Sequence, residues 1–366
     1  GWNTELCNQA AAVAGAVLEE NPVHAGALHY FIHAEDHPEF AKQAWEQAND
    51  YAKVASYSGH ALHMPSHIYL ALGLWDDVVR SNEVSWQAGV DRKAAKKLDN
   101  DALNYHGHWW LEYGYLQQGR FDKALDVLQN QWAFTRELPS ASARNHFVLM
   151  RGHYLVETND WESTFAEEEV KTGGLRLEVR TVDRFIKGLI AFKKGDRRTL
   201  GAMIDQVEKD IETTAQTQRF NEGLTACGAL SLPQIGINQA TILKEELMAL
   251  LYFLNNDPLA ARAHFKKAVD LEDETGHFFG PPGIVKPAHE FYGEFLLAIG
   301  HAEQALVSFE TSLRKSPGRT QSLVGLRDAS RLTGNGEKER AADQKLKNNL
   351  RHAGTASSIK GFFSVP

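Results

Sequence analysis

The stretch from residue 286 to residue 317 reads KPAHEFYGEFLLAIGHAEQALVSFETSLRKSP, and it shows the pattern of the whole chain most clearly. Its apolar side chains recur at spacings of three and four residues, which is the period of an amphipathic helix. Gly300 and the short polar segment after it interrupt this period, and Pro317 ends it. Glycine and proline are typical of helix ends and turns. The stretch therefore predicts two helices joined by a short turn.

Similar interruptions recur along the whole chain. They lie at residues 36–38, 73–76, 119–122, 159–162, 195–196, 256–258 and 300–303. Most of them follow one another after about 40 residues, a spacing typical of a repeated pair of helices. The segments between them lack runs of β-branched residues at period two. We therefore expect an all-α protein built from helical hairpins.

The chain resembles the tetratricopeptide (TPR) repeat family. Five residues of the quoted stretch match conserved-type positions of that family's 34-residue repeat: Gly293, Gly300, Ala305, Phe309 and Pro317. Partial matches extend over most of residues 20–345 and are weakest between residues 197 and 239. The resemblance implies a TPR-like α-solenoid, a right-handed superhelix of about seven or eight helical hairpins.

The same pattern predicts how the chain is divided. The expected parts are repeats with a histidine-rich concave pocket at 1–196, an irregular helix and long loop at 197–240, further repeats at 241–350, and a tail at 351–366. Long loops inside a repeat array are usually functional. We therefore expect the loops at 217–239 and 276–287 to pack toward the concave side. The tail, which contains Phe362 and Phe363, is expected to dock on the end of the solenoid.

Composition narrows the class of partner. The chain has 366 residues, 39 Lys and Arg against 47 Asp and Glu, a net charge of −8, and two cysteines. A mildly acidic chain without a basic block predicts no nucleic-acid partner. No apolar run approaches the roughly 20 residues that span a bilayer, so we expect no membrane span. The protein is expected to be soluble, either cytoplasmic or exported after loss of an N-terminal leader, and its oligomeric state stays open.

Histidine is the residue whose distribution points to function. In the TPR family the first helix of each repeat lines the concave groove, and aligning this chain with the repeat places a set of histidines and neighbouring side chains there. The set consists of His29, His33, His60, His63, His67, His106, Trp109, Tyr113, His146, His153 and Glu157. The resemblance therefore implies that four neighbouring hairpins direct imidazoles into one shared pocket.

Imidazole is the commonest metal ligand in proteins. Residues three or four apart share one face of a helix, so each histidine pair supplies part of a ligand set. We predict His29, His33, His63 and His67 as metal ligands, with the other residues of the set as an additional pocket. Three histidines with an open position suit a divalent transition metal such as Zn, Cu or Fe. Glu35 and Asp36 are candidates to orient the ligands.

Two segments carry a narrower resemblance. HYFIHA at residues 29–34 and HALHMPSH at residues 60–67 are similar to segments shared by a group of bacterial TPR-repeat proteins. This resemblance implies no particular reaction.

Two classes of function stay open at this point. The first is a protein with a histidine-lined, metal-binding pocket. Its more specific version is a metalloenzyme that acts on a small organic substrate. The second is a non-catalytic TPR scaffold that binds a peptide or protein partner in the groove. Glu290 and Glu294 also fall at groove positions, where we expect a solvated face and not an acid–base pair.

Overall fold

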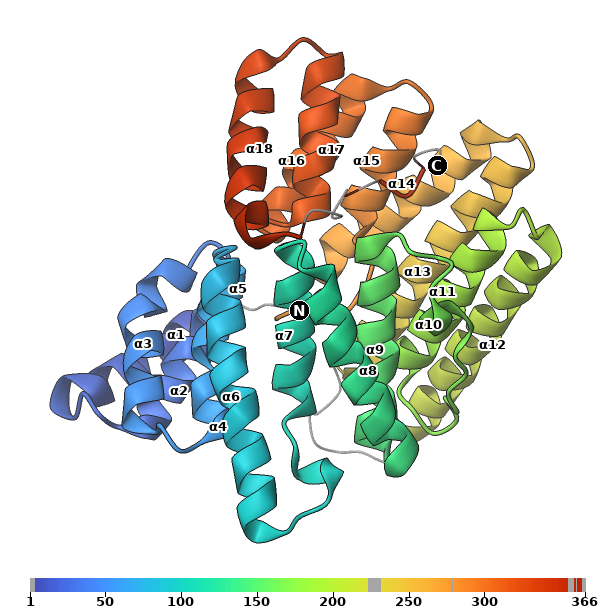
Figure 1. Ribbon diagram of the computed structural model, residues 1–366. Coiled ribbons are helices and arrows are strands. Elements are labelled where there is room, and N and C mark those ends of the chain that lie inside the picture. The colour runs from blue at the N-terminus through green and yellow to red at the C-terminus, as the bar shows by residue number, and fades with distance from the viewer. Residues whose placement is uncertain (1–3, 223–231, 278, 355–358, 360, 364–366) are drawn as a thin grey trace.

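The computed structural model describes residues 4–222, 232–277, 279–354, 359 and 361–363. Within these ranges the chain forms α-helices, short 3-10 turns and loops, and no strand (Figure 1). The predicted all-α fold class is confirmed. No helix among the described residues is long and apolar enough to cross a membrane.

The helices follow one another as antiparallel pairs. The first half contains α1 (Thr4–Glu20), α2 (Ala25–Ala34), α3 (Trp45–Val54), α4 (Gly59–His63), α5 (Pro65–Ala71), α6 (Trp75–Lys96), α7 (Tyr105–Gln117), α8 (Phe121–Glu137), α9 (Ala141–Thr158) and α10 (Thr164–Glu167). The second half contains α11 (Leu177–Lys193), α12 (Arg197–Glu222), α13 (Leu232–Leu254), α14 (Pro258–Thr275), α15 (Ala288–Ala298), α16 (Ala302–Lys315), α17 (Thr320–Leu332) and α18 (Gly336–Asn349). Three 3-10 turns lie at Ala41–Ala44, Asn100–Ala102 and Leu350–His352.

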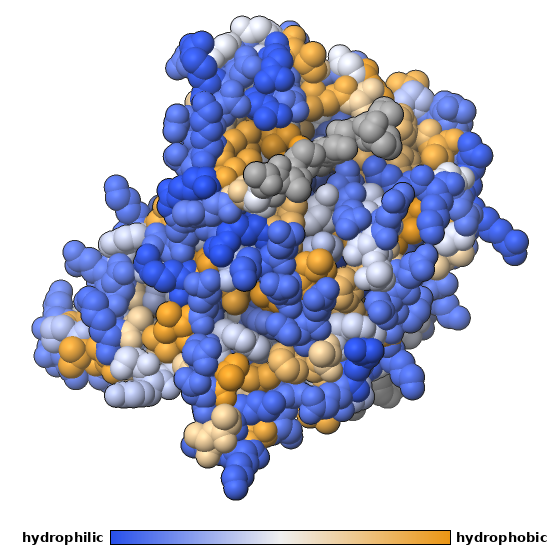
Figure 2. All heavy atoms as spheres, in the orientation of Figure 1, coloured by the Kyte–Doolittle hydropathy of each residue, from blue (hydrophilic) through white to orange (hydrophobic). Residues whose placement is uncertain are grey.

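The first helices of successive pairs form the inner layer. Helix α7 packs on α9, α9 on α11, α11 on α13, and α15 on α17. Hydrophilic side chains cover most of the face shown in Figure 2. Each hairpin thus buries its apolar face against its neighbours, as expected for a TPR-like solenoid.

Small residues allow the close packing that the repeat pattern predicts. The ring of Phe309 on α16 lies against the backbone of α15 and α17. A Cβ atom at Gly293 would approach this ring to 2.8 Å, and one at Gly325 to 2.2 Å. Side chains larger than hydrogen do not fit at such distances, so both glycines are required for the helices to meet.

The array closes on itself. In Figure 1 the turn before α17 lies against the turns that follow α5 and α7. Trp75 Nε1 donates to the carbonyl of Gly318 at 2.9 Å, and the backbone N–H of Thr320 donates to Gln117 Oε1 at 2.8 Å. At Gly73, where φ is +70°, a Cβ atom would lie 2.5 Å from the carbonyl oxygen of Pro317. Only glycine satisfies both this backbone conformation and this contact.

A buried charged group lies at the closure. Arg319 donates to both carboxylate oxygens of Glu290 at 2.7 and 2.8 Å and pairs with Glu157 at 2.6 Å. Its guanidinium also donates to the hydroxyl of Tyr113 at 2.6 Å. Lys286 pairs with Glu290 at 3.0 Å and with Glu294 at 2.7 Å. We refer to these side chains as the closure ion group.

The prediction that Glu290 and Glu294 form a solvated face is wrong. Glu290 is 0% exposed and Glu294 is 6% exposed, because the closure covers the late groove positions. Burial opposes ionisation of Glu290, but the charges of Arg319 and Lys286 outweigh it and hold the pKa of Glu290 at about 2.

The two loops expected on the concave side have different outcomes. The segment at 276–287 does lie on the inner side: Phe279 contacts the ring of His33 at 6.4 Å between centroids, and Gly280 abuts Trp110 of α7. The segment at 217–239 is shorter than predicted, because α12 extends to Glu222 and α13 starts at Leu232. Residues 223–231 of that segment lie outside the described residues, as residue 278 does in the other loop.

The tail docks elsewhere than predicted. Phe362 is buried and its ring contacts Phe192 at the end of α11 and Phe291 on α15. Its backbone N–H donates to Glu294 at 3.1 Å. The expectation of docking on the solenoid end is therefore wrong, since aromatic side chains on the inner helices offer a larger apolar surface.

Replacement of Arg319 by Met is expected to lower the free energy of unfolding by about 3–5 kcal/mol. The change leaves the carboxylates of Glu157 and Glu290 buried without their main counter-charge. Arg331→Met is a matched control, because Arg331 is exposed and pairs with Glu339 on the surface; we expect it to leave stability nearly unchanged. Chemical unfolding followed by circular dichroism measures both, and equal effects would contradict the role given to the closure ion group.

Candidate functional site

Six histidines from four helices form one continuous group. His29 and His33 lie on α2, His60 and His63 on α4, His67 on α5 and His106 on α7. Neighbouring rings contact one another with centroid separations of 4.7 Å (His29–His33), 5.0 Å (His29–His60), 5.0 Å (His33–His67), 5.1 Å (His63–His67) and 4.8 Å (His63–His106). The helical stripes expected from the sequence thus face one another.

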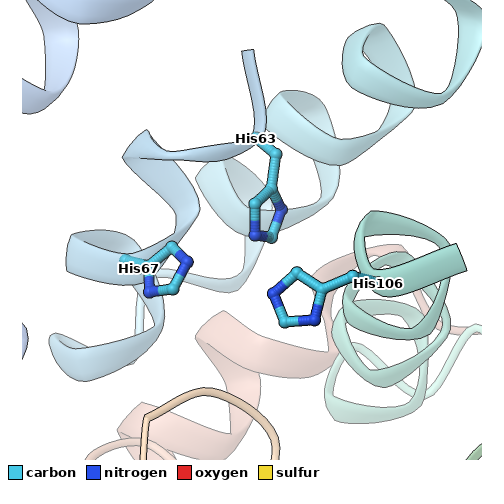
Figure 3. Close-up of side chains that lie close together, drawn as sticks. All are labelled: His63, His67 and His106. Carbon is cyan, nitrogen blue, oxygen red and sulfur yellow. The ribbon is translucent and has the colours of Figure 1, made fainter. Parts of the chain in front are cut away.

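Three of these imidazoles surround a common space. One ring nitrogen each of His63, His67 and His106 lies within 4.8 Å of the others. Figure 3 shows the three rings turned toward one another from α4, α5 and α7. His63 and His67 are buried, whereas His106 is exposed, so the space is reached from the side of His106. We call these residues the inner trio.

The break between α4 and α5 sets the position of two members of the trio. Ser58 caps α4 by accepting a hydrogen bond from the N–H of Ala61, and α4 ends at His63. Pro65 occupies the first position of α5, where its missing N–H costs nothing. The hydroxyl of Ser66 donates to the carbonyl of His63 at 2.6 Å and so satisfies a group that the break leaves without a helical partner.

Neighbouring polar groups fix the tautomers of two members of the trio, His63 and His67. Asn82 Nδ2 donates to the carbonyl of Val78 at 2.8 Å, so Asn82 Oδ1 faces His63 Nδ1 at 2.6 Å and accepts a hydrogen bond from its N–H. This leaves a lone pair on His63 Nε2, a buried atom without a hydrogen-bond partner among the described residues. Asp36 Oδ2 lies 2.6 Å from His67 Nδ1 and in the same way leaves the other nitrogen of His67 free.

A second group of possible ligands shares His67. One atom each of His33, Asp36 and His67 lies within 4.8 Å of the others. Burial, together with the neighbouring charges of His67 and His29, lowers the pKa of His33 to about 4. Burial likewise lowers the pKa of His63 well below its usual value. These imidazoles are therefore neutral at pH 7, the form that binds metals.

The other predicted pocket residues divide between two places. Trp109 stands next to His106, with ring centroids 6.2 Å apart. His153 packs against Tyr113 at 5.1 Å, and Tyr113 and Glu157 bind Arg319 of the closure ion group. His146 lies apart from the inner trio, where its Nδ1–H donates to the carbonyl of Ser142 at 2.8 Å.

Three residues of the site were missed in the sequence. Trp110 contacts His67 at 4.4 Å and His63 at 4.9 Å, although the repeat alignment gave the groove position to Trp109. Its position four residues after His106 was the available signal. Asn82 lies on α6 and has no local pattern that marks it, whereas Phe279 lies in the 276–287 loop that was expected on the concave side but was not named as a site residue.

Two cavities are lined in part by the 276–287 loop. One of about 500 Å³ has a mainly apolar wall that includes Trp109, Leu149, Val179 and Phe279, together with Arg176, and contains no histidine. The other, of about 340 Å³, includes Asp36 and His277 in its wall. The first is of the size and character that suits a small organic ligand.

Comparison with known proteins adds little. No family model matches the chain, and no curated protein matches it. Among solved structures, a human IFIT1 dimer with PPP-AAAA is 12% identical, with 96% of this chain and 69% of that chain covered and a TM-score of 0.37. A monomeric IFIT1 mutant with Gppp-AAAA is 13% identical, with 93% of this chain and 67% of that chain covered and a TM-score of 0.38. Naa15/Naa10 bound to HypK-THB is 13% identical, with 92% of this chain and 60% of that chain covered and a TM-score of 0.23. We draw no conclusion about this chain from TM-scores this low.

Acidification is expected to destabilise the metal-free protein. The folded-state pKa of His33 is depressed to about 4 from 6.5, so the unfolded chain binds this proton more tightly than the folded one. The stability contribution is complete above pH 6.5 and is lost as the pH falls from there toward 4. Melting temperatures between pH 7.5 and 4.5 measure the effect. His33→Gln should flatten this pH dependence, and a steeper or unchanged dependence in the variant would contradict the prediction.

Proposed function

We propose that this chain is a TPR-like repeat protein that binds a divalent transition metal, Zn, Cu or Fe, through His63, His67 and His106. The observation that carries the proposal is the Nε2 atom of His63. It is buried, holds a lone pair because the proton stays on Nδ1 and is donated in a hydrogen bond to Asn82, and faces the other two imidazoles. A buried polar atom without a partner is costly, and a bound cation removes that cost.

The donor set fits such an ion. Three imidazole nitrogens with one open position are the ligand set of many catalytic zinc sites and also suit copper and iron. Asp36 and Asn82 orient two of the ligands, as carboxylates and amides commonly do at metal sites. When bound, the metal supplies a Lewis acid that polarises an oxygen or lowers the pKa of a water molecule.

The cavity of about 500 Å³ supplies the second half of the proposal. Its wall includes Trp109, whose ring lies 6.2 Å from that of His106, and also Arg176 and Glu178. We propose that a small organic molecule seated there directs one polar group toward the open side of the inner trio. We further propose that the chain is a metalloenzyme that acts on such a molecule, and we assign no reaction to it.

A non-catalytic scaffold that binds a peptide in the groove is the alternative. Two segments of the chain itself already cover part of the inner surface. The 276–287 loop lies over His33 and Trp110, and Phe362 fills the space between α11 and α15. The remaining space is better matched to a small molecule than to an extended peptide.

Metal content tests the proposal directly. Protein purified without a histidine tag and incubated with Zn²⁺, then freed of excess ion, is analysed by elemental mass spectrometry. His106→Ala is expected to lower its metal content sharply, since an exposed ligand is removed without a buried cavity. His146→Ala, on the neighbouring helix α9 and outside the trio, should leave it unchanged. Equal metal content in both variants would refute the site.

Replacement of Asp36 by Asn should weaken metal binding about 10- to 100-fold without removing a ligand of the inner trio. The neutral amide holds the Nδ1 proton of His67 less strongly than the carboxylate and makes the imidazole a weaker donor. Titration against a chromogenic chelator measures the affinity. Glu35→Gln is the matched control, because the neighbouring Glu35 is also buried but has no contact with His67 among its described hydrogen bonds. A similar loss in both variants would indicate a general structural effect.

A further inference from the structure

His29 and His60 make a separate contact beside the inner trio. Their Nε2 atoms lie 3.0 Å apart, although the two residues are on different helices, α2 and α4. His60 is exposed and His29 is half-buried, in contrast to the buried His63 and His67. Neither residue belongs to the two groups of three possible ligands that share His67. The contact therefore needs an explanation of its own.

Two arrangements bring ring nitrogens to this distance. In the first, one neutral imidazole donates its Nε2–H to the lone pair of the other. In the second, both nitrogens carry lone pairs directed at one cation. Metal–nitrogen bonds of about 2.0–2.1 Å place neighbouring ligand atoms roughly 3 Å apart, so the observed separation is compatible with a shared ion.

A third donor stands next to the pair. The ring of His33 lies 4.7 Å from that of His29, one helical turn away on α2, and 5.0 Å from that of His67. The inner trio is complete without His33, because His63, His67 and His106 already lie within mutual reach. His29, His33 and His60 are not a group whose ligand atoms all lie within 4.8 Å of one another, so the ring of His33 must turn toward the outer pair to join it as a third ligand.

We propose that His29, His60 and His33 form a second transition-metal site, so that the chain binds two ions. The ligand class is a divalent ion that accepts several imidazoles, such as Zn²⁺, Cu²⁺ or Ni²⁺. The outer site exchanges its ion more readily than the inner trio, because its ligands are closer to solvent. This inference stands on the His29–His60 contact and does not depend on occupancy of the inner trio.

Calorimetric titration of the metal-free full chain with Zn²⁺ tests the proposal. The wild-type chain is expected to bind two equivalents, and His60→Ala and His106→Ala one equivalent each. His60→Asp, which restores an oxygen ligand, should regain the second equivalent with lower affinity. His301→Ala, at an exposed hairpin turn, is the control and should still bind two.

The alternatives give distinct results. One equivalent in the wild-type chain that survives in His60→Ala would show that His29 and His60 only share a hydrogen bond, and would overturn the second site. One equivalent lost in both variants would mean a single site and would also overturn it. Two equivalents that survive in His106→Ala and fall to one in His60→Ala would support the outer site and refute the inner trio. No binding to any variant would refute both.

Discussion

The buried guanidinium of Arg319 is the interaction on which the rest of the structure depends. It joins α17, near the end of the chain, to α7 and α9 in the first half through Tyr113 and Glu157. Burial of a charge costs several kcal/mol unless counter-charges and hydrogen-bond acceptors surround it. Glu290 meets that requirement from the neighbouring helix α15, whereas Glu157 and Tyr113 meet it only when the array is closed. The ion group therefore favours one closed arrangement over the open superhelices that repeat proteins usually form.

Closure also explains why the histidine group is partly covered by the second half of the chain. The inner helices carry imidazoles on α2, α4, α5 and α7, and the 276–287 loop brings Phe279 over them from the second half of the chain. Hydrogen bonds from Asn82 and Asp36 then determine which nitrogen of each ring is free. The repeated helices thus supply the histidines, and residues that interrupt the repeat, such as Pro65 and the loop glycines, set how the side chains of the site are placed.

The sequence was sufficient for the local part of this description. Gly293, Gly300 and Phe309 act within one hairpin and its neighbour, so a repeat pattern reveals them. The histidine stripes follow from the helical period in the same way. The closure was not predictable, because Arg319 and its partners lie far apart in sequence and follow no period. Because the closure was not predicted, Glu290 and Glu294 were wrongly expected to form a solvated face. Which histidines share a space depended on the break at Pro65 and on the placement of α2, and Trp110 was missed by one position of the alignment.

The closure fixes the circumference of the molecule. An open solenoid gains or loses a repeat at its end with little effect on the others, because each repeat contacts only its neighbours. Here, one hairpin added between α9 and α15 would carry Arg319 away from Glu157 and Tyr113 and would leave several buried charges unmet. A change in the number of hairpins therefore disturbs the closure contacts as well as the neighbouring repeats.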